Sequence, residues 1–164
     1  MPVSAILLSL LALVPFIGCG LGALGSHPAA ADRMLTGLIG WAALVLAFTG
    51  GLHWGLAMRE PDTAARTAPA VTSERERNVR IGLAALPPVL GWVALMLPVV
   101  TPPWLALLVL IAAYIAALVV EHRFSAQIVL PPRYLTLRWG FTIVAVAMLT
   151  TVFTLRLLGQ TIVL

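Results

Sequence analysis

Five long apolar stretches, separated by short polar or charged segments, run along almost the whole chain. Membrane-spanning helices are predicted over residues 2–25, 34–58, 79–100, 104–120 and 139–155. Each stretch is close to the roughly 20 residues that an α-helix needs to cross about 30 Å of hydrocarbon. The sequence lacks the alternation of polar and apolar residues that is typical of membrane β-barrel strands. We therefore predict an all-α, polytopic membrane protein in which residues 1–164 form one bundle of about five helices.

Four polar segments form the predicted connections between the helices: residues 26–33, 59–78, 98–103 and 121–138. Ser73 and Glu76 have the spacing of a capping box, in which each side chain bonds the backbone N–H of the other residue. Because a capping box marks the start of a helix, we expect the third helix to begin in water and to continue into the membrane.

The arginines are distributed unequally between the two sides of the membrane in this topology. All ten basic residues are Arg, and eight of them fall on the side that holds the N-terminus. Only Arg33 and Arg156 fall on the other side. Since the cytoplasmic loops of membrane proteins carry the excess of Lys and Arg, we predict a cytoplasmic N-terminus and a C-terminus outside.

The composition supports a membrane location and narrows the classes of partner. Hydrophobic residues make up 61% of the chain, against about 45–50% in soluble domains, and charged residues 10%, against about 25%. The chain has a net charge of +4. Its charged residues lie between the apolar runs and form no basic stripe on a soluble surface, so no nucleic-acid partner is expected. The absence of Lys and the many Ala and Leu residues are typical of a high-GC bacterium, so we expect a multi-pass protein of a bacterial inner membrane.

Small residues recur at four-residue spacing on three of the predicted helices. The positions are Gly18 and Gly22 in the first, Ala47, Gly51 and Gly55 in the second, and Ala112 and Ala116 in the fourth. Lipid tails are as apolar as Leu, so helices associate in membranes through close backbone approach at such small residues. We interpret these positions as helix-packing surfaces, which also suit a helix of another protein or of a second copy.

Two adjacent prolines, Pro87 and Pro88, lie inside the third predicted helix. Each proline removes a backbone donor and clashes with the preceding turn, so a bend is expected. The carbonyls near Leu83 and Ala84 would then need other partners.

An ionisable residue, His53, lies six residues before Arg59, which places it roughly 9 Å into the membrane at 1.5 Å per residue. Such a residue is by default a candidate for function. The predicted topology brings further polar and aromatic groups to the same depth. The candidate binding cluster is His53, Trp54, Glu121, Tyr134 and Arg138.

A structural role for the same cluster is the alternative interpretation. Glu121 and Arg138 could form an ion pair that closes a loop, and Trp54 and Tyr134 are ordinary residues for a membrane interface. The sequence offers no metal-ligand spacing, no glycine-rich phosphate loop and no nucleophile beside a base. We therefore predict no catalytic residue, no metal and no cofactor, and leave open a bound quinone or lipid.

Three segments resemble one known family. Residues 50–57 (GGLHWGLA), 86–95 (LPPVLGWVAL) and 130–138 (LPPRYLTLR) are similar to motifs of the transmembrane protein 69-like family, domain of unknown function 3429. One departure is Arg133, which stands where the family motif has Trp. The resemblance implies a compact multi-span protein of bacterial inner membranes and mitochondria, and it implies no activity.

Two classes of function follow. The preferred hypothesis is a non-catalytic accessory, assembly or stabilising subunit of a larger membrane complex, such as a respiratory complex, because the chain is small and carries several small-residue surfaces. The alternative is a protein that binds a lipid or a quinone near the cytoplasmic leaflet, with the polar site around His53. A transporter is a weaker third hypothesis, because the chain is small and only one titratable residue lies well inside the membrane.

Overall fold

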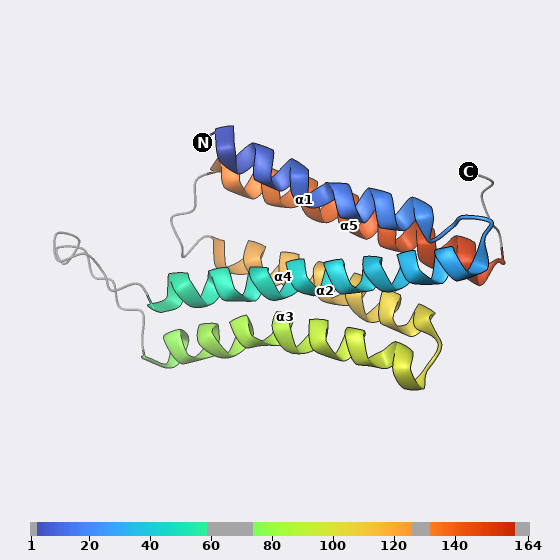
Figure 1. Cartoon of the computed structure of the whole chain (residues 1–164). Coiled ribbons are helices and arrows are strands. Elements are labelled where there is room, and N and C mark those ends of the chain that lie inside the picture. Colours follow the sequence, from blue (N-terminus) through green and yellow to red (C-terminus); the bar gives the residue numbers. More distant parts are fainter. Residues whose placement is uncertain (1–2, 59–73, 126–131, 160–164) are drawn as a thin grey trace.

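The computed structural model describes residues 3–58, 74–125 and 132–159, which form a bundle of five α-helices (Figure 1). The helices are α1 (Val3–Gly22), α2 (Pro28–Met58), α3 (Glu74–Val100), α4 (Pro103–Ser125) and α5 (Pro132–Leu157). No strand occurs within these described ranges. The predicted all-α bundle of about five helices is therefore confirmed.

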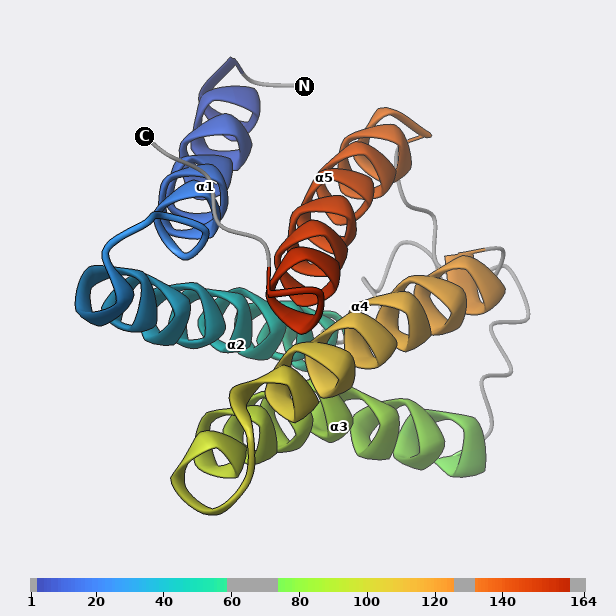
Figure 2. The ribbon, with the colours of Figure 1, turned by 90° about the vertical axis from the view of Figure 1, so that its right-hand side faces the viewer.

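Successive helices alternate in direction, so the bundle has two distinct ends (Figure 1). We call the end where α1 begins the N-terminal end; α3 and α5 also begin there, and α2 and α4 finish there. Each helix contacts the next in the sequence, α5 contacts α1, and α2 also contacts α4 (Figure 2). The helices thus form a closed ring, with α2 and α4 meeting across its middle.

The helices are apolar enough to lie in a membrane. Four described segments have the length and composition of a membrane span: Pro28–Gly51, Ile81–Val100, Pro103–Arg123 and Thr136–Leu157. The described apolar part of α1, Leu7–Gly22, is shorter. Large apolar side chains also cover the outer surface, for example Phe48, which is 76% exposed. Exposing such a large apolar surface to water would be unfavourable, so the protein is a multi-pass membrane protein.

Aromatic side chains hold the centre of the bundle together. The Phe16 ring on α1 packs edge-on against Tyr114 on α4 and Phe141 on α5, with centroid distances of 6.2 and 5.8 Å. The buried Tyr114 hydroxyl donates a hydrogen bond of 2.9 Å to the carbonyl of Ala42 on α2. These contacts connect four helices at one level of the bundle. Edge-to-face packing is a favoured geometry for aromatic rings, and a buried Tyr hydroxyl usually has a hydrogen-bond partner.

The helix ends differ from the predicted connections. Residues 28–33, expected in a loop, are helical from Pro28, whose missing N–H is harmless at the first position of a helix. The predicted loop over residues 121–138 is wrong at both of its ends, because α4 continues to Ser125 and α5 begins at Pro132. The helix α3 begins at Glu74, and the proposed cap residue Ser73 lies outside the described residues. Two charged residues at these ends are paired with α5: Asp32 on α2 with Arg156 at 2.8 Å, and Glu121 on α4 with Arg138 at 2.9 Å.

Most of the glycines that lie closest to a neighbouring helix are not among the predicted packing residues. A Cβ atom added to Gly50 would lie 2.5 Å from the Ala84 carbonyl oxygen, and one added to Gly91 would lie 2.9 Å from the Ala43 carbonyl oxygen. These two glycines bring α2 and α3 together. Gly20 makes a similarly close approach to Met148, between α1 and α5.

The predicted packing residues have mixed positions. Gly22 lies against Met34, and Ala47 is half-buried. In contrast, Gly18, Gly51 and Gly55 are exposed, with no described atom within 4 Å of an added Cβ, and Ala112 and Ala116 are also exposed. These five residues face outward and do not bring described helices of this chain together. Their pairing with another chain stays a prediction.

Candidate functional site

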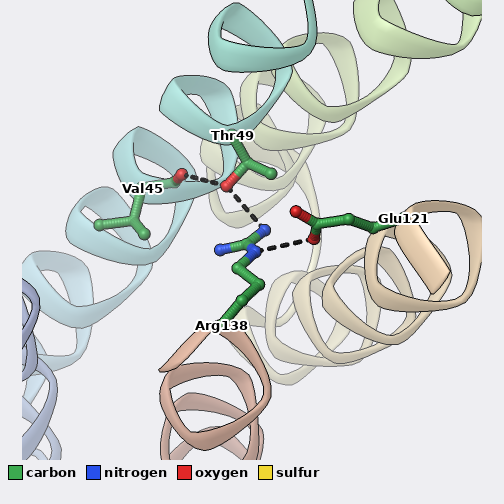
Figure 3. Close-up of polar contacts among 4 residues, drawn as sticks. All are labelled: Val45, Thr49, Glu121 and Arg138. Atoms are coloured by element: carbon green, nitrogen blue, oxygen red, sulfur yellow. Dashed lines mark hydrogen bonds and ion pairs between the residues drawn. The ribbon is translucent and has the colours of Figure 1, made fainter. Parts of the chain in front are cut away.

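A buried polar cluster connects α2, α4 and α5 (Figure 3). Its members lie in the last part of α2 and α4 and the first part of α5, and therefore toward the N-terminal end of the bundle. Arg138 on α5 donates from Nε to Glu121 Oε2 on α4 and from Nη2 to Thr49 Oγ1 on α2, both at 2.9 Å. The Arg138 side chain is 11% exposed and the Glu121 side chain 1%. We refer to Thr49, Glu121 and Arg138 as the polar cluster.

The Thr49 hydroxyl both donates and accepts a hydrogen bond. It donates a hydrogen bond of 3.0 Å to the Val45 carbonyl, one turn earlier on α2, and it accepts the bond from Arg138. Threonine commonly bonds the carbonyl four residues before it in membrane helices, where water cannot compete. This bond orients the hydroxyl oxygen so that its free lone pair faces the guanidinium.

The polar cluster balances its charges inside the bundle. A single buried guanidinium or carboxylate would be strongly unfavourable in a medium of low dielectric constant. The Arg138–Glu121 ion pair makes the cluster neutral, and the bond to Thr49 uses a further N–H group. The three side chains therefore stabilise one another in a place where each would be costly by itself.

The polar cluster lies at one depth along the membrane normal. Each member lies two residues inside the end of its candidate span: Thr49 in Pro28–Gly51, Glu121 in Pro103–Arg123 and Arg138 in Thr136–Leu157. Two residues correspond to about 3 Å of helix rise. The cluster therefore lies toward one end of the apolar part of the bundle.

A groove of about 430 Å³ begins beside the polar cluster and is lined by α1, α2 and α5. Arg138, Thr49 and Ser9 provide its polar part, and Ala12, Val45 and Phe141 are among its apolar walls. The volume falls within the usual range of about 300–1,000 Å³ for small-molecule sites. We call this space the lateral groove.

The rim of the lateral groove faces the surrounding lipid. Leu8 on α1 and Leu44 and Phe48 on α2 line the groove, and they are 65%, 63% and 76% exposed. A molecule dissolved in the membrane can therefore enter from the side, between α1 and α2, without crossing water.

Trp41 forms the wall of the lateral groove farthest from the polar cluster along α2. Its indole N–H donates a hydrogen bond of 2.9 Å to the Ala12 carbonyl on α1. Ala12 belongs to the turn before Pro15, which has no N–H to donate to the carbonyl of Leu11, the neighbour of Ala12. Trp41 precedes Thr49 by eight residues, so the groove extends about 12 Å toward the middle of the membrane.

The structure brings together part of the predicted binding cluster. Glu121 and Arg138 form the predicted ion pair, which lies buried between α4 and α5 on either side of the connection that joins these two helices. Trp54 donates its indole N–H to the Ile81 carbonyl at 3.1 Å, so it ties α2 to α3 and does not line the groove. His53 in α2 and Tyr134 in α5 have side chains outside the described residues.

Sequence reasoning missed the contribution of α1 and the role of Thr49. Thr49 has one usable signal, because it lies one turn before His53 and at the depth where Arg138 enters the membrane. Ser9 and Ala12 carry no such signal, since both are ordinary residues within an apolar run. Only the packing of α1 against α2 and α5 makes them part of a site.

Polar character continues one turn deeper on α5. Thr142 follows Arg138 by four residues and is buried, and its hydroxyl has no hydrogen-bond partner among the described residues. Most buried hydroxyls are paired, so Thr142 is an exception among the described residues, and it does not line the groove. Over the described ranges, no group of three or more His, Cys, Asp or Glu residues is arranged to hold a metal ion.

Comparison with known proteins places the chain in a family. Residues 1–154 match the family model described as "Protein of unknown function (DUF3429)". The chain belongs to the DUF3429 family. No curated protein and no solved structure matches the chain.

The match to the DUF3429 family includes the whole polar cluster and every residue that lines the lateral groove. The resemblance predicted from the three motifs is thereby confirmed for domain of unknown function 3429. The likeness to transmembrane protein 69 stays a prediction. The family supports the multi-pass architecture and brings no activity with it.

Proposed function

We propose that this membrane protein binds one amphipathic, lipid-like molecule in the lateral groove. The proposal rests on one observation: an apolar groove that opens to lipid has a buried polar cluster at the end nearest the membrane surface. Ligand sites are typically apolar pockets with a few fixed polar groups that set orientation. The function is binding, and it needs no catalytic residue.

The shape of the groove supports one orientation of the ligand. Its polar part meets Arg138 and Thr49 at the headgroup level, and its apolar part extends toward Trp41. An amphipathic molecule in the surrounding leaflet already has this orientation, so it enters between Leu8 and Phe48 with little loss of rotational freedom.

We place the groove in the cytoplasmic leaflet of a bacterial inner membrane. The argument is the arginine distribution, because the N-terminal end of the bundle carries most of the arginines and also holds the polar cluster. Excess positive charge marks the cytoplasmic side.

The test blocks the lateral groove without removing a polar group. Ala12→Phe places a ring inside the groove, and Ala116→Phe places the same ring on the lipid-facing side of α4 as a matched control. Each protein is purified in mild detergent, and bound molecules are identified by native mass spectrometry and by chromatography of an organic extract.

We expect one lipid-like molecule per chain in the unmodified protein and in Ala116→Phe, and its loss in Ala12→Phe. Equal amounts of the molecule in both variants would show that it binds elsewhere. Recovery of bulk lipids alone in all three proteins would contradict the proposal.

A second candidate function is an accessory, assembly or stabilising subunit of a larger membrane complex, with a respiratory complex as the first to examine. One observation favours it: Gly18, Gly51 and Gly55 face outward without contacting described residues of this chain. Exposed glycines allow a partner helix, from another protein or a second copy, to approach closely.

The partner hypothesis is tested on native gels of solubilised membranes. Gly51→Leu should release the chain from a larger complex, whereas Gly140→Leu should not. Both glycines are exposed with no described atom within 4 Å of an added Cβ, but Gly140 lies on α5, outside the repeat formed by Gly51 and Gly55. Migration as a single small species before any substitution would argue against a stable partner.

A further inference from the structure

The polar cluster presents hydrogen-bond donors to the lateral groove. Arg138 donates to Glu121 from Nε and to Thr49 from Nη2, whereas the third nitrogen, Nη1, points away from Glu121 and has no partner among the described residues (Figure 3). An arginine carries five N–H groups, so those on Nη1 are still available. Thr49 already uses its single donor on Val45. A ligand that bonds the cluster must therefore supply acceptor atoms.

The polar cluster carries no net charge that could attract a charged headgroup. Glu121 lies 2.9 Å from the guanidinium and cancels its charge inside the bundle. An anionic headgroup placed against Arg138 would bring a second negative charge close to Glu121, in a region of low dielectric constant. An uncharged acceptor avoids this repulsion and still accepts a charge-assisted hydrogen bond.

The walls of the lateral groove suit a flat headgroup. Trp41, Phe48 and Phe141 contribute aromatic rings from α2 and α5, and the remaining walls are aliphatic apart from the polar end. Aromatic rings pack favourably against other flat π systems. Bulky, hydrated headgroups would leave polar groups unpaired against these walls.

We infer that the ligand is a neutral membrane quinone, whose ring carbonyl accepts a hydrogen bond from Arg138 while its isoprenoid tail leaves the groove toward the lipid. The inference rests on the proposed function and deepens it by naming the ligand class. Glu121 is then a specificity-determining residue, because its charge decides whether the site accepts a neutral or an anionic headgroup.

The experiment follows Trp41 as an internal reporter. In a variant with Phe at the other four tryptophan positions, 54, 92, 104 and 139, a short-chain quinone should quench the fluorescence saturably, at one molecule per chain. Phosphatidic acid with acyl chains of comparable length is then used as a competitor. We expect phosphatidic acid to bind at least roughly tenfold more weakly than the quinone, a difference of about 1.4 kcal/mol.

Replacing Glu121 tests the source of this preference. Glu121→Gln keeps the size of the side chain and leaves Arg138 positively charged, so the affinity for phosphatidic acid should rise roughly tenfold relative to that for the quinone. Glu121→Asp keeps the negative charge and should keep the preference for the quinone. The comparison of the two ligands in the unmodified protein stands even if one variant fails to fold.

The outcomes separate the two proposals. A preference for phosphatidic acid in the unmodified protein, or an unchanged preference in a folded Glu121→Gln, would overturn the quinone inference and leave groove binding intact. Saturable quenching that persists in Ala12→Phe would place the quinone outside the groove and overturn the inference. Absence of saturable binding by any lipid-like molecule would overturn the proposed function itself.

Discussion

Gly50 of α2 lies directly against the carbonyl oxygen of Ala84 on α3. An added Cβ would come within 2.5 Å of that oxygen and 2.6 Å of Pro88 Cδ. Pro88 has no N–H, so it cannot pair with the Ala84 carbonyl four residues earlier. Because Gly50 has no side chain, α2 can lie close to this freed carbonyl and to the proline ring of α3.

Gly50→Ala should destabilise the protein, because neither backbone nor a proline ring can move easily to make room. We expect a loss of about 1–3 kcal/mol, the usual effect of overpacking. Thermal unfolding in detergent measures it as a lower midpoint temperature. Gly51→Ala is the matched control, since Gly51 is exposed with no described atom within 4 Å, and its midpoint should be unchanged or slightly raised. Equal effects at both positions would contradict the close approach.

Removing one member of the Arg138–Glu121 pair should be more harmful than removing both. Arg138→Met leaves the Glu121 carboxylate buried, and Glu121→Met leaves the guanidinium buried; each should cost about 3–5 kcal/mol. The double variant carries no buried charge and should recover most of this loss. Unfolding free energies of the four proteins form a double-mutant cycle, and simple additivity would show that the pair does not interact.

Tyr114→Phe should have a small effect and Tyr114→Ala a large one. The first removes the hydroxyl bond to Ala42, and measured hydrogen bonds between membrane helices average about 0.6 kcal/mol. The second also removes the ring that packs against Phe16, so about 3–5 kcal/mol should be lost. Unfolding free energies of both variants test the order. A Tyr114→Phe effect as large as that of Tyr114→Ala would show that the hydroxyl bond dominates.

The predicted orientation can be tested at two exposed arginines on opposite ends of the bundle. Cys19 is the single cysteine of the chain and is first replaced by Ala. In this background, Arg33→Cys should react with a membrane-impermeant maleimide in intact cells. A cysteine replacing Arg123 should react only after the membrane is opened, because most arginines mark that end as cytoplasmic. The reverse labelling pattern would invert the topology and place the lateral groove in the outer leaflet.

Several features of the site were accessible from the sequence, and others were not. Glu121 and Arg138 could be paired because both are charged and the predicted topology brings them to one depth. The sequence places Thr49 one turn before His53, but its hydrogen bond to Arg138 depends on how α2 and α5 are rotated within the bundle. The small-residue repeat pointed to Gly51, whereas the close contact is made by its neighbour Gly50.

The amino-acid sequence by itself determined the number of helices, their approximate limits and their membrane location. Lipid forces each apolar segment to satisfy its own backbone hydrogen bonds, so these properties are local. The tertiary structure decided which side of each helix faces inward, and with it the polar cluster and the lateral groove. Helices that are apolar on all sides carry no pattern that marks an inner face, so their rotation depends on contacts with every neighbour at once.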